Sequence, residues 1–310
     1  MNDIQKSDFS SKSDNCGISK TGAEHDGFGW DLHCHSSFSD GTCSPAELVE
    51  KAAQIGLSGV AITDHDTTAG WQQAAAAAQK LNFPLIRGTE ITSHFGRVSV
   101  HILAWLYDPQ NEAICALFDN LTKMRKERIL LMTDKISKDY PIDREAVFAC
   151  MKSGDETTPG RPHIADALVA AGVCENRSQA FAGIISLKSP YYVPASSPDA
   201  VQVIKAVKNA CGAVGIAHSG AIYSRGPVLS EEQIEELADA GLDALEIFHR
   251  DNPEEQRIRL KKIAGRLNLL ATAGSDWHGK GKINRMGENA SDSETVREIV
   301  KRSFLTVAGM

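Results

Sequence analysis

Two histidines in the run Asp31-Leu-His33-Cys-His35 have the spacing of a shared metal site. On a strand, residues i and i+2 point to the same face, so both imidazoles can bind one ion. The turn Ser39-Asp40-Gly41 follows, and its glycine allows the bend that would return the carboxylate of Asp40 to the same place. The pair alone has a second explanation, because two histidines on a half-buried strand can be hydrogen-bonded core residues.

Further imidazole and carboxylate groups stand at or just after the ends of other apolar segments. Together they are six of the ten histidines and three carboxylates, namely His33, His35, Asp40, His65, Glu90, His101, His218, Asp276 and His278. Core packing does not need imidazole at so many strand ends, since each buried histidine requires hydrogen-bond partners. We therefore predict that these nine residues converge and form the catalytic metal site.

Nine nitrogen and oxygen donors are too many for one ion and suit two or three divalent ions, with Glu90 as the expected bridge. The absence of cysteine from the set disfavours a structural zinc site, and mixed imidazole and carboxylate ligation fits Mn, Fe or Zn equally. Three divalent ions would carry more charge than three carboxylates neutralise, so the site should attract a phosphate ester. Two ions roughly 3.5–4 Å apart can generate a bridging hydroxide for in-line attack on such an ester.

Seven short apolar segments are the strands expected to position these groups: 29–33, 59–63, 84–88, 98–105, 213–217, 244–248 and 269–273. Helices with clear start signals lie between most of them, including capping sequences at Ser44, Ser230 and Asn252. Alternating strands and amphipathic helices predict a parallel sheet or barrel, in which active sites lie at the carboxyl ends of the strands. The short polar turn at residues 93–97 predicts a hairpin instead of a helical crossover.

The alternation stops between residues 107 and 192, where two helices are expected at 111–138 and 164–171. We predict a helical insertion domain over 107–192, a barrel domain over 29–106 and 193–310, and a disordered arm over 1–28. The arm lacks the apolar segment of a signal peptide. The seven cysteines have no disulfide pattern, so a cytoplasmic protein is expected.

Composition limits the classes of partner that the protein is expected to bind. The net charge of −7 disfavours duplex DNA and membrane surfaces, and no apolar run approaches the length of a membrane helix. A small phosphorylated nucleotide, or a short RNA 5′ end, remains compatible with a local cationic site. The pattern carries no indication of oligomeric state.

The motifs around these donors resemble those of the PHP (polymerase and histidinol phosphatase) superfamily. The resemblance runs from about residue 29 to 279 and rests on these segments: His33-x-His35, Ser39-Asp40-Gly41, Thr63-Asp64-His65, Glu90, His101-Ile-Leu, Ala217-His218 and Gly274-Ser275-Asp276-Trp277-His278. Gly160-Arg161-Pro162-His163 and Tyr192-Val193-Pro194 resemble the inserted domain of one branch, which contains stand-alone bacterial phosphoesterases acting on nucleoside 3′,5′-bisphosphates, AMP-like nucleotides and short RNA 5′ ends. One departure is Ser219-Gly220 after His218, where proline is common in the family.

The resemblance implies a distorted (β/α)7 TIM-like barrel with a trinuclear site. By position, one metal ion would take His33, His35, Glu90 and Asp276. A second would take Asp40, His65 and His278, and a third would take Glu90, His101 and His218. The implied activity is hydrolysis of nucleotide phosphate monoesters by a metal-bridging hydroxide. The alternatives are a 5′-3′ exoribonuclease, a histidinol-phosphate phosphatase, and a non-catalytic metal-binding PHP module.

Three further residues are predicted to bind substrate: Arg161, His163 and His249. A guanidinium is the preferred bidentate phosphate donor, although Arg161 could instead pair within the insertion and His163 could be exposed. His249 could contact substrate or orient a ligand. Asp64 adjoins His65 and could orient a ligand imidazole. Arg125 and Arg128, on the long helix, are interpreted mainly as a solvated face, although one of them could reach the mouth of the barrel.

Overall fold

The computed structural model describes residues 28–223 and 226–310. The predicted arm over 1–28 therefore lies outside the described residues except for its last residue. Within the described part, seven strands form one sheet in chain order, at Trp30–Asp31 (β1), Gly59–Ile62 (β2), Leu85–Phe95 (β3), Val98–Trp105 (β4), Ala213–Ile216 (β5), Ala244–Phe248 (β6) and Leu270–Ala273 (β7).

The sheet curls into a nearly closed barrel, as predicted. Neighbouring strands are parallel except that β4 is antiparallel to both β3 and β5. The segments after β1 and β7 meet where Leu32 N–H donates to the carbonyl of Ala273 and His35 N–H donates to that of Trp277, at 3.4 and 2.8 Å. These contacts join the first and last strands. Six of the seven strands run in the same direction, and the carboxyl ends of β1, β2, β5, β6 and β7 gather at one rim.

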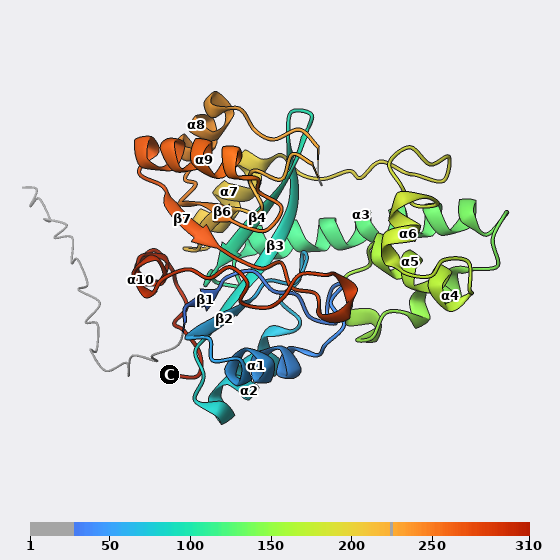
Figure 1. Ribbon diagram of the computed structural model, residues 1–310, viewed down its shortest axis with the longest axis horizontal. Coiled ribbons are helices and arrows are strands. Elements are labelled where there is room, and N and C mark those ends of the chain that lie inside the picture. Colours follow the sequence, from blue (N-terminus) through green and yellow to red (C-terminus); the bar gives the residue numbers. More distant parts are fainter. Residues whose placement is uncertain (1–27, 224–225) are drawn as a thin grey trace, which may run out of the picture.

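The predicted hairpin is present, but it is longer than expected. β3 continues to Phe95 and turns at Gly96, whose φ of +57° suits glycine, so Phe95 pairs with Val98. Figure 1 shows this long pair of strands within the sheet that forms the barrel wall, with the hairpin end extending beyond it. Glu90 and His101 therefore lie within strands and not at their ends, at the level where the other strands stop.

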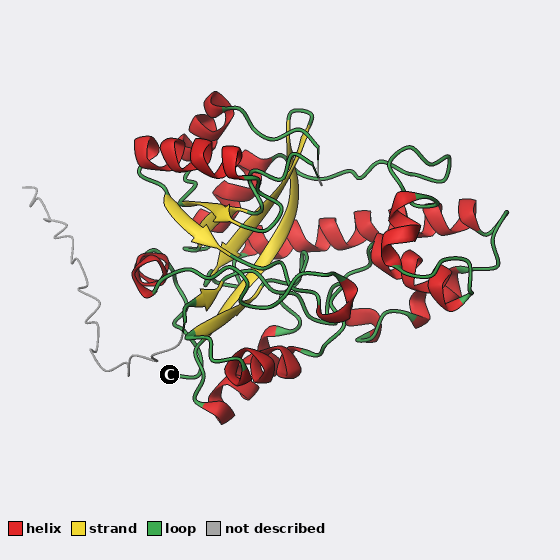
Figure 2. Ribbon diagram, viewed as in Figure 1, coloured by secondary structure: helices red, strands yellow, loops and turns green. Residues whose placement is uncertain are grey.

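Helices cover the outside of the barrel (Figures 1 and 2). They are Pro45–Gln54 (α1), Trp71–Leu81 (α2), Ala200–Asn209 (α7), Glu231–Asp239 (α8), Glu254–Leu267 (α9) and Ser293–Lys301 (α10). The capping boxes at Ser44 and Ser230 are formed. The one expected at Asn252 was wrong, because its side chain donates to the carbonyls of Glu246 and Ile247 instead.

Residues that alternate along the strands form two apolar layers. Val60, Ile62 and Leu85 pack outward against the helices, whereas Ala61 and Ile86 face inward and pack with Trp105. The inward layer also includes residues of α10. The indole of Trp105 donates to the carbonyl of Leu32 at 3.1 Å, so the interior is filled below the rim.

The insertion carries four helices, at Glu112–Ile136 (α3), Arg144–Ala149 (α4), Arg161–Ala170 (α5) and Arg177–Ala182 (α6). Its apolar residues form a cluster separate from the barrel core. α3 belongs to both, because Ile114 and Leu121 pack in the barrel core while Ile129 and Met132 pack in the insertion. The domain boundaries at 106/107 and 192/193 stay a prediction.

Candidate metal centre

The segments after β1 and β7, together with β3, bring four predicted ligands to one point inside the rim. The Nε2 atoms of His33 and His35 lie 3.1 Å apart. Oε2 of Glu90 is 3.2 and 3.1 Å from these two nitrogens, and Oδ1 of Asp276 is 3.5 and 3.4 Å from them. All four residues are buried, so their donor atoms form a compact tetradentate set.

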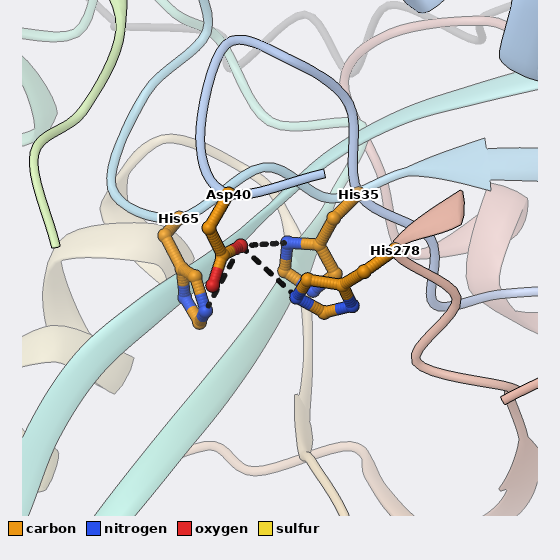
Figure 3. A group of neighbouring side chains, drawn as sticks. All are labelled: His35, Asp40, His65 and His278. Atoms are coloured by element: carbon orange, nitrogen blue, oxygen red, sulfur yellow. Dashed lines mark ion pairs between the residues drawn. The ribbon is translucent and has the colours of Figure 1, made fainter. Parts of the chain in front are cut away.

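A second group lies around Asp40 (Figure 3). Its Oδ1 is 2.9 Å from Nε2 of His278, and 3.9 Å from both Nδ1 of His35 and Nε2 of His65. The residues come from three separate segments, which the barrel places together. This group contains the three ligands implied for the second ion and adds His35, which offers its other nitrogen to the first group.

Glu90 connects these donors to a third set. Its Oε1 lies 2.7 Å from Nδ1 of His101 and 2.9 Å from Nε2 of His218, while its Oε2 lies 3.3 Å from Nδ1 of His65. One carboxylate thus faces two groups with its two oxygens, which is the geometry of a bridging ligand. The nine predicted residues are all brought together here, and their roles as ligands stay predictions.

Neighbouring acceptors fix the tautomers of two histidines. Glu246 accepts the Nδ1 proton of His33 at 3.0 Å, and the carbonyl of Asp276 lies 2.8 Å from Nδ1 of His278. A ring that donates from Nδ1 leaves the lone pair of Nε2 for a metal. Both Nε2 atoms point into the groups described above.

The donor set fits metal ions because it leaves buried polar atoms unsatisfied. Among residues 28–223 and 226–310, the ligand atoms that lack a hydrogen-bond partner include Asp40 Oδ1, His65 Nδ1, Glu90 Oε2 and His278 Nε2. An unsatisfied buried polar group costs about 1–3 kcal/mol. Divalent cations would satisfy these atoms together and repay that cost.

The ionisation of the groups also suits cations. Burial alone would raise the pKa of Asp276, but Lys282 and the rings of His278 and His33 hold it well below its usual range. Burial lowers the pKa of His278 to about 4, which keeps this ring neutral at pH 7. For His35, burial lowers the pKa, but Asp276 and Glu90 outweigh it and raise the value to about 9. Metal binding there should therefore release a proton.

The three predicted substrate residues are placed differently. Arg161 begins α5, and its guanidinium lies over the ring of Phe181 at 5.0 Å while donating to the carbonyl of Ile185. His163 is buried, and its two ring nitrogens contact Gly160 N–H and the carbonyl of Ser39. His163 therefore connects the insertion to the loop of Asp40, and its role toward substrate stays a prediction.

His249 is the member of this set that lies beside the ligands. Its Nδ1 accepts the N–H of Asp251 at 3.1 Å, so Nε2 carries the ring proton. Nε2 is buried, has no hydrogen-bond partner in the described part of the chain, and lies 4.0 Å from Oδ2 of Asp276. It can donate to a group that enters the site.

Several residues at the site were not predicted. Glu246 supports His33 and also accepts the backbone N–H of His218, and Lys282 pairs with Asp276 at 2.7 Å. A carboxylate inside the apolar strand Ala244–Phe248 was the available signal for Glu246. Lys282 had no signal, because it follows the last motif in an irregular segment.

Other interpretations require correction. Asp64 does not orient His65 by any hydrogen bond in the described part of the chain, but accepts bonds from Ser36 and Ser39. Arg125 and Arg128 are not a solvated face. Arg125 pairs with buried Asp66, and Arg128 donates to the carbonyl of Val193 and lies over Tyr192.

Comparisons with known proteins point to one family. The PHP domain model matches residues 31–170. A 5′-3′ exoribonuclease of Haemophilus influenzae is 30% identical over 249 residues, covering 80% of this chain and 89% of the relative. The chain belongs to the PHP domain family.

Two other PHP relatives are similar over comparable lengths. A 3′,5′-nucleoside bisphosphate phosphatase of Chromobacterium violaceum is 29% identical over 260 residues, covering 82% of this chain and 89% of the relative. A crystal structure from Bifidobacterium adolescentis, described as a metal-dependent phosphoesterase, has a TM-score of 0.88 and 54% identity and covers 89% of this chain and 96% of that chain. The present chain is a metal-dependent phosphoesterase of this family.

Proposed function

We propose that this enzyme hydrolyses phosphate monoesters of small nucleotides, with a nucleoside 3′,5′-bisphosphate or an AMP-like nucleotide as substrate. The observation that carries the proposal is the convergence of nine imidazole and carboxylate residues. Eight of them form three overlapping groups, and His218 adjoins these through Glu90. Several of these residues have unsatisfied buried atoms. Two or three divalent ions, Mn, Fe or Zn, fit these donors. When bound, they supply the positive charge that activates water and stabilises the phosphoryl group during transfer.

The residues of the chain divide the work of holding these ions. His33, His35 and Asp276 form the deepest group, and Glu90 joins it to His101 and His218. Asp40, His65 and His278 form the group nearer the insertion. Glu246 keeps the proton of His33 on the nitrogen that faces away from the centre, so the other nitrogen stays available as a ligand.

Three side chains are proposed to act on substrate. The Nε2 proton of His249 points toward Asp276 and would donate to an oxygen of the phosphate being cleaved. Arg161 would bind a second phosphate of the nucleotide, because a guanidinium can donate two parallel hydrogen bonds to one phosphate. His163 would assist from the same helix, although the Ser39 carbonyl already occupies one of its nitrogens.

A 5′-3′ exoribonuclease acting on short RNA ends is the second candidate, because the Haemophilus relative carries that name. The net charge of −7 disfavours long nucleic acid and duplex DNA, since phosphate neutralisation dominates such binding. A single terminal nucleotide could still enter the site. Histidinol phosphate is a poorer candidate, because the insertion with Gly160-Arg161-Pro162-His163 resembles that of the nucleotide branch.

One assay separates these candidates. Enzyme reconstituted with Mn, Fe or Zn is offered AMP, a nucleoside 3′,5′-bisphosphate, histidinol phosphate and a 5′-phosphorylated oligoribonucleotide. The proposal expects the highest kcat/KM on a mononucleotide, and at least two metal equivalents per chain by elemental analysis. A preference for the oligonucleotide would favour the exoribonuclease. Full activity with one equivalent or less would contradict the multinuclear site.

We also propose the division into a barrel at 29–106 and 193–310 and an insertion at 107–192, supported by the separate apolar cluster of the insertion. No helix within residues 28–223 and 226–310 has the length and hydropathy to cross a bilayer. A cytoplasmic location is proposed from the described cysteines, which are free thiols.

A further inference from the structure

The loop that carries Asp40 accepts a hydrogen bond from the insertion at each of four consecutive carbonyl groups. The donors and acceptors are Thr157 Oγ1 to Ser37 O (3.2 Å), Thr158 N to Phe38 O (2.9 Å), His163 Nε2 to Ser39 O (3.0 Å) and Arg177 Nη1 to Asp40 O (2.8 Å). Two of the donors are backbone or hydroxyl groups near η1 (Gly154–Glu156), and the other two are side chains of α5 and α6. The insertion thus determines the path of this loop.

Arg177 makes the contact closest to the ligand. Nε and Nη2 each bind one oxygen of Asp166 at 2.6 Å, which leaves Nη1 directed at the carbonyl of Asp40. The side chain of Arg177 is 15% exposed. A Cβ on Gly281 would lie 2.4 Å from Nη1, so the guanidinium also packs against the turn that follows His278. One side chain therefore touches two of the three segments that supply the second ligand group.

The carboxylate of Asp40 depends on this support. Its Oδ1 has no hydrogen-bond partner in the described part of the chain. The nearest group is Nε2 of His278 at 2.9 Å, and this nitrogen carries no proton when Nδ1 donates to the carbonyl of Asp276. Within the loop, Gly41 N–H donates to the carbonyl of Ser36, and Asp64 binds Ser36 and Ser39. These bonds hold residues on either side of Asp40, whereas Arg177 binds the carbonyl of Asp40 itself.

We propose that Arg177 is a positioning residue for the metal ion held by Asp40, His65 and His278, and that the insertion is an integral part of this metal site. The inference rests on the metal site proposed above. It also gives the insertion a second role, because α5 carries both His163, which holds the loop, and Arg161, which is proposed to bind substrate. A ligand bound to the insertion and a metal ion at Asp40 would then alter each other's affinity reciprocally.

The test measures metal binding without turnover. Wild type, Arg177→Ala and Arg177→Lys are stripped of metal and titrated with Co²⁺ against a competing chelator, with visible absorption reporting the coordination. Residues that orient metal ligands change affinity by about 10–100-fold. Arg177→Ala should lower the affinity for one of the bound Co²⁺ ions by that factor. Its visible absorption spectrum with Co²⁺ should match that of Asp40→Asn. Arg177→Lys should fall between, since one ammonium cannot bind Asp166 and Asp40 in the same way.

Arg144→Ala is the matched control, because Arg144 also pairs with an aspartate of the insertion, Asp134, but is 55% exposed. It should bind Co²⁺ like wild type. If Arg177→Ala does not fold, Asp166→Asn loosens the same guanidinium while keeping its own size, and should weaken the same equivalent. Wild-type affinity in a folded variant would overturn the inference, as would an equal loss at every site. Failure of wild type itself to bind more than one ion would instead overturn the proposed metal site.

Discussion

Glu246→Gln tests the claim that one buried carboxylate orients ligands from two strands. Glu246 is fully buried, and its oxygens lie 3.0 and 3.2 Å from Nδ1 of His33, while Oε2 accepts the backbone N–H of His218 at 2.5 Å. Glutamine keeps the size but offers one oxygen and one NH₂ group. One of the two N–H donors must then face another donor.

The expected cost follows from that mismatch. A buried donor left unpaired costs about 1–3 kcal/mol. Loss of ligand orientation should lower metal affinity by about 10–100-fold, which corresponds to about 1.4–2.7 kcal/mol. We therefore expect weaker metal binding in Glu246→Gln, together with a melting temperature a few degrees lower for the metal-free protein.

Chelator competition measures the affinity, and circular dichroism measures the melting. Glu298→Gln is the control, since Glu298 pairs with Lys301 on the surface of α10, and such changes stay within about 0.5 kcal/mol. A variant that melts early but binds metal like wild type would show that Glu246 only supports the fold. Wild-type values in both measurements would refute the reasoning altogether.

Three further predictions concern the same centre. Asp276→Asn removes a ligand charge, so metal content and kcat should both fall, and near wild-type activity with saturating Mn, Fe and Zn each tested would count against a ligand role. Gly274→Ala should destabilise the fold by about 1–3 kcal/mol, because the new Cβ would lie 2.3 Å from Oε1 of Glu246. Gly265 in α9 has open space around it, so Gly265→Ala is the control and should leave the stability equal or higher. Chemical denaturation measures both. Arg161→Ala should raise KM for a 3′,5′-bisphosphate by a factor equivalent to about 1.5–3 kcal/mol and leave KM for a small aryl phosphate unchanged. Equal losses on both substrates would instead assign Arg161 to the cleaved phosphate or to folding.

The sequence predicted the barrel and the gathering of donors because both depend on local order along the chain. A strand followed by a polar residue places that residue at the rim whatever the neighbouring strands are. This reasoning located His65, His218 and Asp276 without knowledge of their partners. It misplaced the end of β3, because Ser93, His94 and Phe95 read as turn residues although pairing with β4 extends the strand through them.

The sequence pattern could not predict contacts between segments that lie far apart in the chain. Helical periodicity shows that Arg125 and Arg128 lie away from the apolar stripe of α3, but it does not show whether that face meets water or another segment. Arg177 had no distinctive neighbours in the sequence. Its position became informative only when α6 was seen beside the loop of Asp40, which requires the tertiary arrangement.

The closure of the barrel has a consequence for how long the folded state lasts. Strands β1 to β7 pair in chain order, so each can join its predecessor, whereas contacts such as Leu32 with Ala273 and His35 with Trp277 join the two ends of the barrel sequence. His33 and His35 lie on one side of this seam and Asp276 on the other. A cation held by all three ties the seam only after the chain has closed. Interactions that form after the folding transition state slow unfolding without speeding folding. Metal loading should therefore lengthen the lifetime of the closed barrel while the rate at which the chain folds stays nearly constant.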